Sequence, residues 1–136
     1  MAELNLEIIT PEKPVLKENI DSVTIPGTLG SFQILKNHAP LVSSFDIGVI
    51  KVKKSSADLF YTTAGGTVEV NDNKVLVLAD SIENLNEIDV SRAEKSKERA
   101  EERLKKKQEE AIDEARANAS LRRALNRLDA VRKYSK

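Results

Sequence analysis

The sequence predicts an α+β protein, in which an N-terminal β-sandwich of short strands is followed by a C-terminal antiparallel two-helix hairpin. The first reason is that every glycine and proline lies before residue 67, whereas every arginine lies after residue 91. Glycine and proline punctuate strands and turns, and arginine is a good helix former. The second reason is that the spacing of apolar residues changes from strand-like to helical near residue 88. We therefore expect a sandwich over residues 1–86 and a hairpin over residues 87–136.

Short apolar runs separated by turn residues predict roughly eight or more strands in the first part of the chain. Alternation is clear at Leu4, Leu6 and Ile8, which fall on one face of a first strand. Further apolar runs lie at 20–25, 32–35, 49–52, 59–62, 67–70 and 75–78. The segment 71–74 predicts a turn, because its Asn and Asp residues tolerate left-handed backbone angles. Strands and turns at this spacing favour a sandwich or a barrel.

Signs of catalysis are weak. Gly65-Gly66-Thr67 resembles a phosphate loop only superficially, since it lacks the terminal Gly-Lys-Ser/Thr. We interpret it as a tight turn or bulge, and Gly27-Thr28-Leu29-Gly30 as another turn. The single histidine, His38, has no acid beside it and precedes Pro40, which favours a loop or interface role over a catalytic one. A free-standing enzyme is therefore a poor interpretation.

The helical pattern begins after Ile88, and Asp89 is placed as the N-cap. The expected inner face of the first helix consists of Val90, Ala93, Ala100, Leu104, Ala111 and Ala115. We expect a break near Ala117–Ser120, where Asn118 or Ser120 would cap a second helix. The expected inner face of that helix consists of Leu121, Ala124, Leu125, Leu128 and Val131.

The inner face expected for the first helix is thin and mostly alanine. An alanine side chain offers little apolar area, which is worth about 25 cal/mol per Å² when buried. A hairpin of this kind packs closely but is weakly held to anything else. We therefore expect that it can detach, and that the detachment is used.

Charge is unevenly divided, although 22 basic and 22 acidic residues cancel. Residues 1–87 hold seven lysines against twelve acids, and residues 88–136 hold 15 basic against ten acidic residues. The basic part is expected to meet an acidic partner or an anion. The absence of cysteine excludes disulfides and thiolate zinc sites. With no signal-peptide pattern and no long apolar run, we expect a soluble cytoplasmic protein that meets a membrane only through a partner.

Four arginines are candidates for binding an anion. Arg92 and Arg99 are seven residues apart, hence on one side of the first helix, and Arg123 and Arg127 are neighbours on the second. Guanidinium groups suit a polyphosphate, and converging cations without an anion would repel one another. The alternative is a solvated basic face threaded with acids, which spacing alone favours. Asp89 by itself likewise indicates a cap rather than a ligand contact.

Two binding functions of other classes compete. The basic tail prompts a nucleic-acid module, but ten acids interleave with its cations and only Tyr134 is aromatic, so base stacking is nearly absent. The other alternative is a chaperone-like or adaptor protein that binds its partners with the helical hairpin. Co-purification with unfolded client proteins would favour the adaptor.

Four motifs, in order and at the right spacing, carry a resemblance to a known family. They are Asn37-His38-Ala39-Pro40-Leu41, Thr63-Ala64-Gly65-Gly66, Ile88-Asp89-Val90-Ser91-Arg92-Ala93 and Arg123-Ala124-Leu125-Asn126-Arg127-Leu128. Over essentially its whole length the chain resembles the epsilon subunit of the bacterial F-type ATP synthase. The resemblance implies a sandwich of about ten strands followed by a two-helix hairpin, in a non-catalytic rotor subunit.

The resemblance also implies partners. The sandwich would dock on the gamma subunit and rest on the ring of c subunits, helping to couple rotation to proton flow. The residues expected for this docking are Ser31, His38, Ala39, Pro40 and Leu41. The extended hairpin would meet the catalytic alpha and beta subunits and block ATP hydrolysis, whereas the folded-down hairpin would permit turnover. The protein would then be peripheral on the cytoplasmic side of a bacterial cell membrane.

In some bacterial members of this family the folded-down hairpin binds ATP, and the resemblance implies the same here. The matching residues are Glu83, Ile88, Asp89, Arg92, Ala93, Arg99, Arg123 and Arg127. Arg122 is an additional neighbour on the second helix, which leaves open which arginine points at phosphate. ATP would be a sensed ligand rather than a substrate, and neither a metal nor a nucleic acid is expected to bind.

Overall fold

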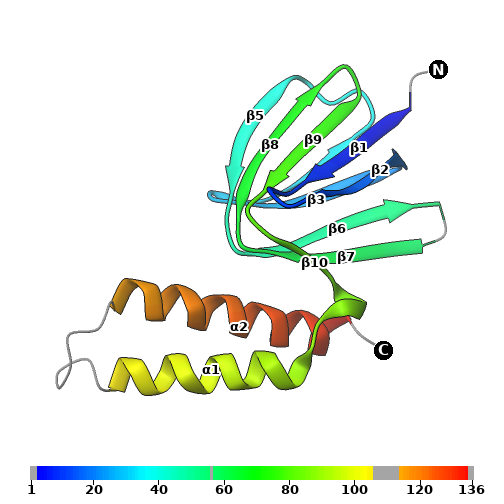
Figure 1. Cartoon of the computed structure of the whole chain (residues 1–136). Coiled ribbons are helices and arrows are strands. Elements are labelled where there is room, and N and C mark those ends of the chain that lie inside the picture. Colours follow the sequence, from blue (N-terminus) through cyan, green and yellow to red (C-terminus); the bar gives the residue numbers. More distant parts are fainter. Residues whose placement is uncertain (1–2, 56, 106–113, 135–136) are drawn as a thin grey trace. The chain divides into compact units, whose positions relative to one another are not determined.

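The computed structural model describes residues 3–55, 57–105 and 114–134 (Figure 1). It contains two compact units, Met1–Asn84 and Leu85–Lys136, of which the first is built of strands and the second of helices. The predicted α+β class, with strands first and helices second, is therefore confirmed.

Ten strands make up the first unit. They are β1 (Leu4–Ile9), β2 (Pro14–Ile20), β3 (Ser22–Gly27), β4 (Gly30–Leu35), β5 (Leu41–Phe45), β6 (Gly48–Lys54), β7 (Ala57–Thr63), β8 (Gly66–Asn71), β9 (Lys74–Ala79) and β10 (Ile82–Asn84). They form one sheet in the order β10-β7-β6-β3-β5-β8-β9-β1-β2, with β4 paired to β3 outside this path. Figure 1 shows the sheet folded over itself, so that β5, β8, β9, β1 and β2 lie in one layer and β6, β7 and β10 in the other.

The core of the first unit lies between these two layers. Alternate residues of β1, β6, β8 and β9 are buried there, as Leu4, Leu6 and Ile8 are in β1. The other members of the core are Ile20, Val23, Ile25, Ile34, Phe45, Ile50, Val52, Tyr61, Val68, Val70, Val75, Val77 and Ala79. Most of them are β-branched, and such side chains pack well on a pleated sheet. The alternation predicted from the sequence is thus the pattern that builds this core.

The turns follow the residues that signalled them. Asp72 and Asn73 connect β8 to β9 with φ values of 50° and 59°, which Asn and Asp tolerate better than other non-glycine residues. At the start of β8, a Cβ atom on Gly66 would lie 2.1 Å from the carbonyl oxygen of Leu78. Gly66 is therefore required by a close backbone approach, and the segment is a connection between β7 and β8 rather than a phosphate loop.

The second unit begins with a 3₁₀ turn (Leu85–Glu87), followed by α1 (Val90–Lys105) and α2 (Glu114–Tyr134). The carboxylate Oδ1 of Asp89 accepts a hydrogen bond from the backbone amide of Arg92 at 3.1 Å. The Asp89 carbonyl accepts the first helical bond, from the amide of Ala93 at 3.0 Å. The predicted N-cap at Asp89 is therefore confirmed.

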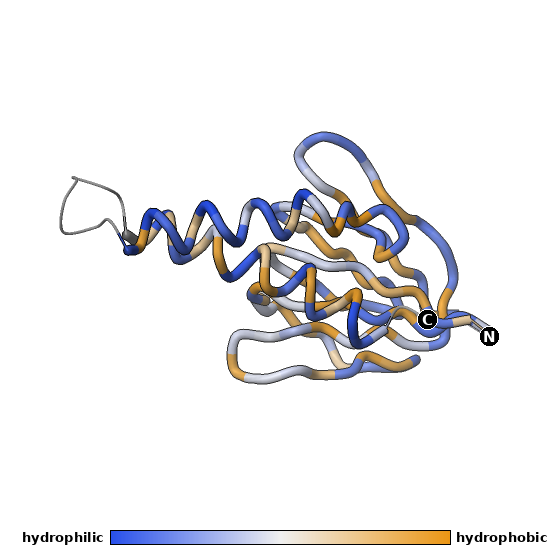
Figure 2. Tube along the Cα trace, turned by 90° about the horizontal axis from the view of Figure 1, so that it is seen from below, coloured by the Kyte–Doolittle hydropathy of each residue, from blue (hydrophilic) through white to orange (hydrophobic). Residues whose placement is uncertain are grey.

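The described side chains that are buried in the two helices are all alanine. We call Ala93, Ala100, Ala117, Ala124 and Ala130 the alanine seam, and each is at most 3% exposed. Figure 2 shows the rest of both helices as mostly hydrophilic. The prediction of a thin alanine face is confirmed, but Leu125 does not belong to it, because its side chain is 37% exposed. Val90 is likewise exposed, at 38%, since the first turn of α1 leaves it outside the seam.

The predicted helix break near Ala117–Ser120 is wrong. These four residues lie inside α2, so Asn118 and Ser120 do not cap it. Ala115, expected on the inner face of the first helix, belongs to α2 and is exposed. Alanines alternate with polar residues over 115–119, and their high helix propensity outweighs the capping preference of Asn and Ser. The segment 106–113 between the helices, including Ala111, lies outside the described residues.

Candidate functional site

The docking residues predicted around His38 fall in the connection between β4 and β5, here called the docking loop (residues 36–40). The backbone amide of His38 donates to the carbonyl of Leu35 at 3.2 Å. Its ring nitrogen Nδ1 lies 2.7 Å from the carbonyl oxygen of Ala39, which makes Nδ1–H the donor. His38 is half-buried, and both hydrogen bonds hold it within its own loop. Ala39 and Pro40 beside it are exposed.

The structure does not bring all five predicted docking residues together. Leu41 begins β5 directly after the docking loop, where it pairs with Val70 of β8 and is half-buried. Ser31, in contrast, lies at the start of β4, opposite Pro26, while the docking loop follows the end of that strand. At about 3.3 Å per residue, β4 separates Ser31 from the docking loop by roughly 17 Å. His38 and its neighbours thus form one surface, and Ser31 belongs to the opposite end of the strand.

Two exposed apolar side chains beside the docking loop were missed from the sequence. Leu35, just before the loop, is 53% exposed, and Val42, just after Leu41, is 76% exposed. Both lie on the more exposed side of their strands, whose opposite side carries the buried residues Ile34 and Phe45. The signal was present, because strand periodicity makes Ile34 and Leu35 face opposite ways. Exposed apolar residues that gather in one patch mark interaction sites, which makes Leu35 and Val42 candidates for contact with a partner.

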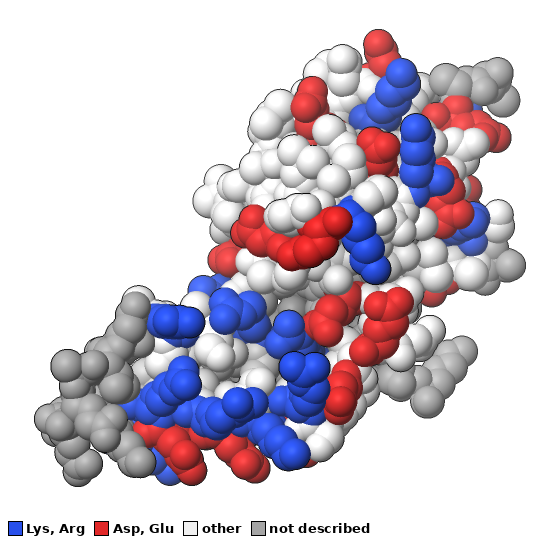
Figure 3. Space-filling view, viewed as in Figure 1, with Lys and Arg blue, Asp and Glu red and all other residues white. Residues whose placement is uncertain are grey.

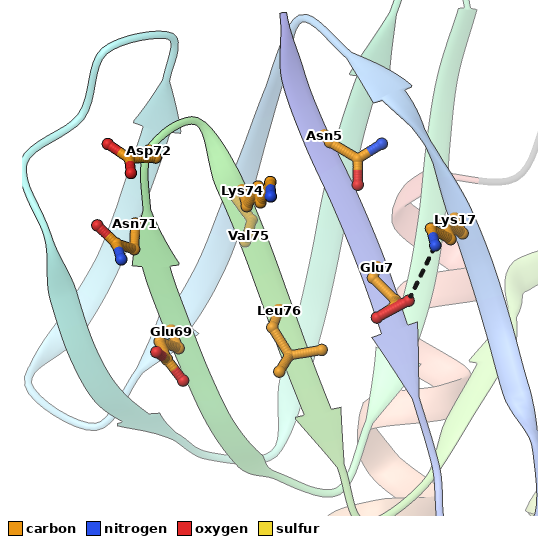
Figure 4. A pocket seen from close by; sticks show the side chains of 9 residues that line it. All are labelled: Asn5, Glu7, Lys17, Glu69, Asn71, Asp72, Lys74, Val75 and Leu76. Atoms are coloured by element: carbon orange, nitrogen blue, oxygen red, sulfur yellow. Dashed lines mark ion pairs between the residues drawn. The ribbon is translucent and has the colours of Figure 1, made fainter.

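The outer face of β8, β9, β1 and β2 carries a shallow hollow, shown in Figure 4. It is lined by Asn5, Glu7, Lys17, Glu69, Asn71, Asp72, Lys74, Val75 and Leu76. Three of these residues are acidic and two are lysines, and Lys17 is paired with Glu7 at 4.0 Å. A hollow with more carboxylates than cations is a poor site for a nucleotide polyphosphate.

Two of the four candidate arginines are exposed on the helices, and the other two are half-buried. Arg92 and Arg99 are exposed on α1, where Arg99 Nε donates to the Lys95 carbonyl at 3.4 Å. Arg123 on α2 is half-buried, as is Arg127 one turn further on. Within the described residues, no carboxylate is ion-paired with Arg92, Arg99 or Arg123.

The helices run antiparallel, so the start of α1 lies beside the C-terminal part of α2 (Figure 1). Arg92 belongs to the first turn of α1, and Arg123 and Arg127 lie near the middle of α2. Figure 3 shows Lys and Arg side chains gathered on one face of the helical unit. Arg122, the extra neighbour noted in the sequence, is exposed, whereas Arg123 is half-buried. The helical unit therefore presents a cationic face.

The remaining candidate nucleotide contacts have local roles already. Ala93 is part of the alanine seam, so only its backbone is available to a ligand. Ile88 is half-buried, and its amide donates to the Leu85 carbonyl at 3.4 Å. Glu83 lies in β10, where it pairs with Thr62 of β7. Asp89 is occupied at Oδ1 by the cap bond described above.

Neither a metal centre nor a membrane span is visible in the described part of the chain. In residues 3–55, 57–105 and 114–134, no three His, Asp or Glu side chains are grouped as metal ligands would be. Neither α1 nor α2, as described, is long and apolar enough to cross a membrane.

A sandwich followed by two long helices is the domain pair of one protein class. Residues 3–85 match the beta-sandwich domain of the ATP synthase Delta/Epsilon chain, and residues 86–132 match the long alpha-helix domain of the same chain. The chain therefore belongs to the ATP synthase delta/epsilon chain family, as the resemblance of its motifs predicted. The members are non-catalytic subunits, so the prediction that this protein is not an enzyme is confirmed.

Bacterial relatives agree over most of the length. An ATP synthase epsilon chain of Symbiobacterium thermophilum is 47% identical over 132 residues, which cover 96% of this chain and 94% of the relative. One from Nitratidesulfovibrio vulgaris is 46% identical, with 92% of each chain covered. A chain of the Euglena gracilis mitochondrial ATP synthase has the same fold, with a TM-score of 0.82 over 96% of this chain and 82% of its own, at 21% identity.

Proposed function

We propose that this protein is a rotor subunit in the central stalk of a bacterial F-type ATP synthase, where it helps couple rotation to proton flow. Family membership over both units supports the proposal. The solved neighbours agree with it, since their titles describe ATP synthase assemblies that include a c-ring or central stalk. The observation that carries the regulatory part is the alanine seam, because helices held by such small side chains rearrange at low cost.

The docking loop and its surroundings support the proposed contact with the gamma subunit and the c-ring. His38, Ala39 and Pro40 form a compact surface flanked by the exposed side chains of Leu35 and Val42. In a complex, the side chains of Leu35 and Val42 would supply part of the apolar buried centre that protein interfaces have. Ser31, at the other end of β4, would then meet a different part of the rotor. Through these contacts the protein would sit peripherally on the cytoplasmic side of the cell membrane.

The helical unit is the proposed brake on ATP hydrolysis. Its cations face solvent on one side, which fits an acidic segment of the alpha or beta catalytic subunits. In the extended state the helices would reach these subunits and block the hydrolytic direction. In the closed state they would leave the catalytic subunits free.

ATP is the proposed signal that selects the closed state. A triphosphate would neutralise Arg92, Arg99, Arg123 and Arg127, which otherwise repel one another when the hairpin closes. A ligand that binds one state only shifts the equilibrium toward that state. At one hundred times its dissociation constant, the gain is about 2.7 kcal/mol. The alanine seam contributes little by itself, so a gain of this size is sufficient to decide the state.

Calorimetric titration of the full chain with ATP tests the proposal. We expect saturable binding to the wild type, and loss of binding in the double variant Arg123→Ala, Arg127→Ala, because the phosphate contacts of α2 are removed. Arg132→Ala is the matched control, since Arg132 lies on the same helix and is exposed but pairs with Asp129 at 3.1 Å. It should bind ATP as the wild type does. An absence of heat at millimolar ATP in the wild type would refute ATP sensing in this protein.

A further inference from the structure

One asparagine connects three segments at the end of the sandwich that carries the docking loop. Asn73, in the β8–β9 turn, accepts a hydrogen bond at its backbone carbonyl from the amide of Asn5 in β1, at 2.8 Å. Its side-chain Oδ1 accepts a bond from the backbone amide of Asn37 at 2.6 Å. Its Nδ2 donates in return to Oδ1 of Asn37 at 3.2 Å. We call these two hydrogen bonds between Asn37 and Asn73 the asparagine clasp.

Backbone conformation by itself does not account for the clasp. Asn37 and Asn73 have φ values of 67° and 59°, and a left-handed residue is favoured as Gly, Asn or Asp. Glycine satisfies that requirement at both positions without any side chain. The two bonds of the clasp instead join residues 36 positions apart in the sequence. They therefore fix the docking loop against a separate hairpin, which the left-handed turns do not require.

We propose that the asparagine clasp positions the docking loop for its partner on the rotor. Asn37 immediately precedes His38, whose amide and ring are bonded to Leu35 and Ala39. The clasp thus attaches the docking loop to the β8–β9 turn, whereas the bonds of His38 stabilise the conformation of the loop itself. Asn73 acts through the loop and is a positioning residue. A loop held in its bound conformation loses less entropy when it binds. This inference rests on the proposed docking function.

Substitutions at Asn73 separate the clasp from the turn. Asn73→Gly keeps the left-handed backbone and removes both side-chain bonds. Asn73→Asp keeps the acceptor for the Asn37 amide and removes only the donor. Asn71→Asp is the matched control, because it adds the same charge to the same hairpin at an exposed residue on the outer-face hollow (Figure 4). All three variants of the full chain should fold, since the core between the layers is unchanged.

Amide hydrogen exchange measured by NMR reports the clasp directly. In Asn73→Gly the Asn37 amide should exchange faster and the His38 ring signals should shift, because the acceptor is lost. In Asn73→Asp the Asn37 amide should remain protected. Unchanged exchange of the Asn37 amide in Asn73→Gly would overturn the clasp, whatever the docking loop binds.

Affinity of the full chain for a complex of gamma subunit and c-ring reports the function. Asn73→Gly should bind about fivefold more weakly, as expected for two neutral hydrogen bonds that are partly exposed. Asn71→Asp should bind as tightly as the wild type. His38→Ala should bind more weakly than both Asn71→Asp and Asn73→Gly. If His38→Ala weakens binding and Asn73→Gly does not, the positioning role is overturned while docking stands. If neither His38→Ala nor Asn73→Gly weakens binding, the docking proposal fails and the positioning role fails with it.

Discussion

At the start of α1, the carboxylate of Asp89 already caps the helix, and this role limits how it can contact a ligand. Its Oδ1 accepts from the Arg92 amide, and its charge lies at the positive end of the helix dipole. A carboxylate repels phosphate, so a contact between Asp89 and ATP would have to be with a donor such as a sugar hydroxyl or the adenine amino group. The cap role and the ligand role therefore respond differently to substitution.

We expect Asp89→Ala to destabilise the helical unit by about 1 kcal/mol, because the cap acceptor is lost. Asp89→Asn should leave that stability almost unchanged, since asparagine also caps, but should weaken ATP binding through loss of the charge. Urea unfolding followed by circular dichroism at 222 nm measures the first effect, and calorimetry the second. ATP affinity equal to wild type in Asp89→Asn would restrict Asp89 to capping.

On the scale of one element, the alanine seam explains how two helices rich in charge stay together. Alanine allows close helix approach and costs no side-chain entropy on burial. The same small side chains bury little area, so the seam itself gives the described part of the hairpin little apolar attachment. Close packing and weak attachment therefore have a single cause.

A larger side chain in the seam should force the helices apart. We expect Ala124→Leu, at a position that is 0% exposed, to destabilise the helical unit by about 1–3 kcal/mol through overpacking. Ala115→Leu makes the same change at an exposed position of the same helix and should shift stability by less than about 0.5 kcal/mol. Thermal melts at 222 nm compare the two. Equal melting curves would show that the seam is not tightly packed.

On the scale of the whole molecule, the two units divide the proposed work. The sandwich has a β-branched core and a docking loop held by long-range bonds, as a fixed attachment requires. The helical unit has a small-residue seam and a cationic face, as a movable regulator requires. A ligand that binds one arrangement of the helices would set the population of the regulator without altering the attachment.

The absence of native cysteine allows paired labels without background. With cysteines introduced at Glu12 in the sandwich unit and Glu101 on α1, both exposed, we expect ATP to narrow the distance distribution measured by electron spin resonance. The Arg123→Ala, Arg127→Ala variant should keep the broad distribution, because it lacks the proposed phosphate contacts. A distribution that is identical with and without ATP in the wild type would contradict a ligand-controlled regulator.

Much of the fold could be predicted from local pattern. Period-two alternation located the buried face of strands such as β1, and the Asn-Asp-Asn segment located the β8–β9 turn. Asp89 was identified as a cap because capping depends on neighbours within one turn. The helix break near Ala117–Ser120 failed for the opposite reason, since cap residues also occur inside helices when alanine around them favours the helix.

The sequence by itself determined the fold class and the family, and it supplied the residues that we propose for docking and for anion binding. Tertiary structure decided that Ser31 and His38 lie at opposite ends of β4, that Leu125 is exposed, and that Asn73 clasps Asn37. The physical reason is the sequence separation of the residues that interact. Alternation and capping act between residues a few positions apart, whereas a contact across 36 positions depends on how the sheet folds over itself.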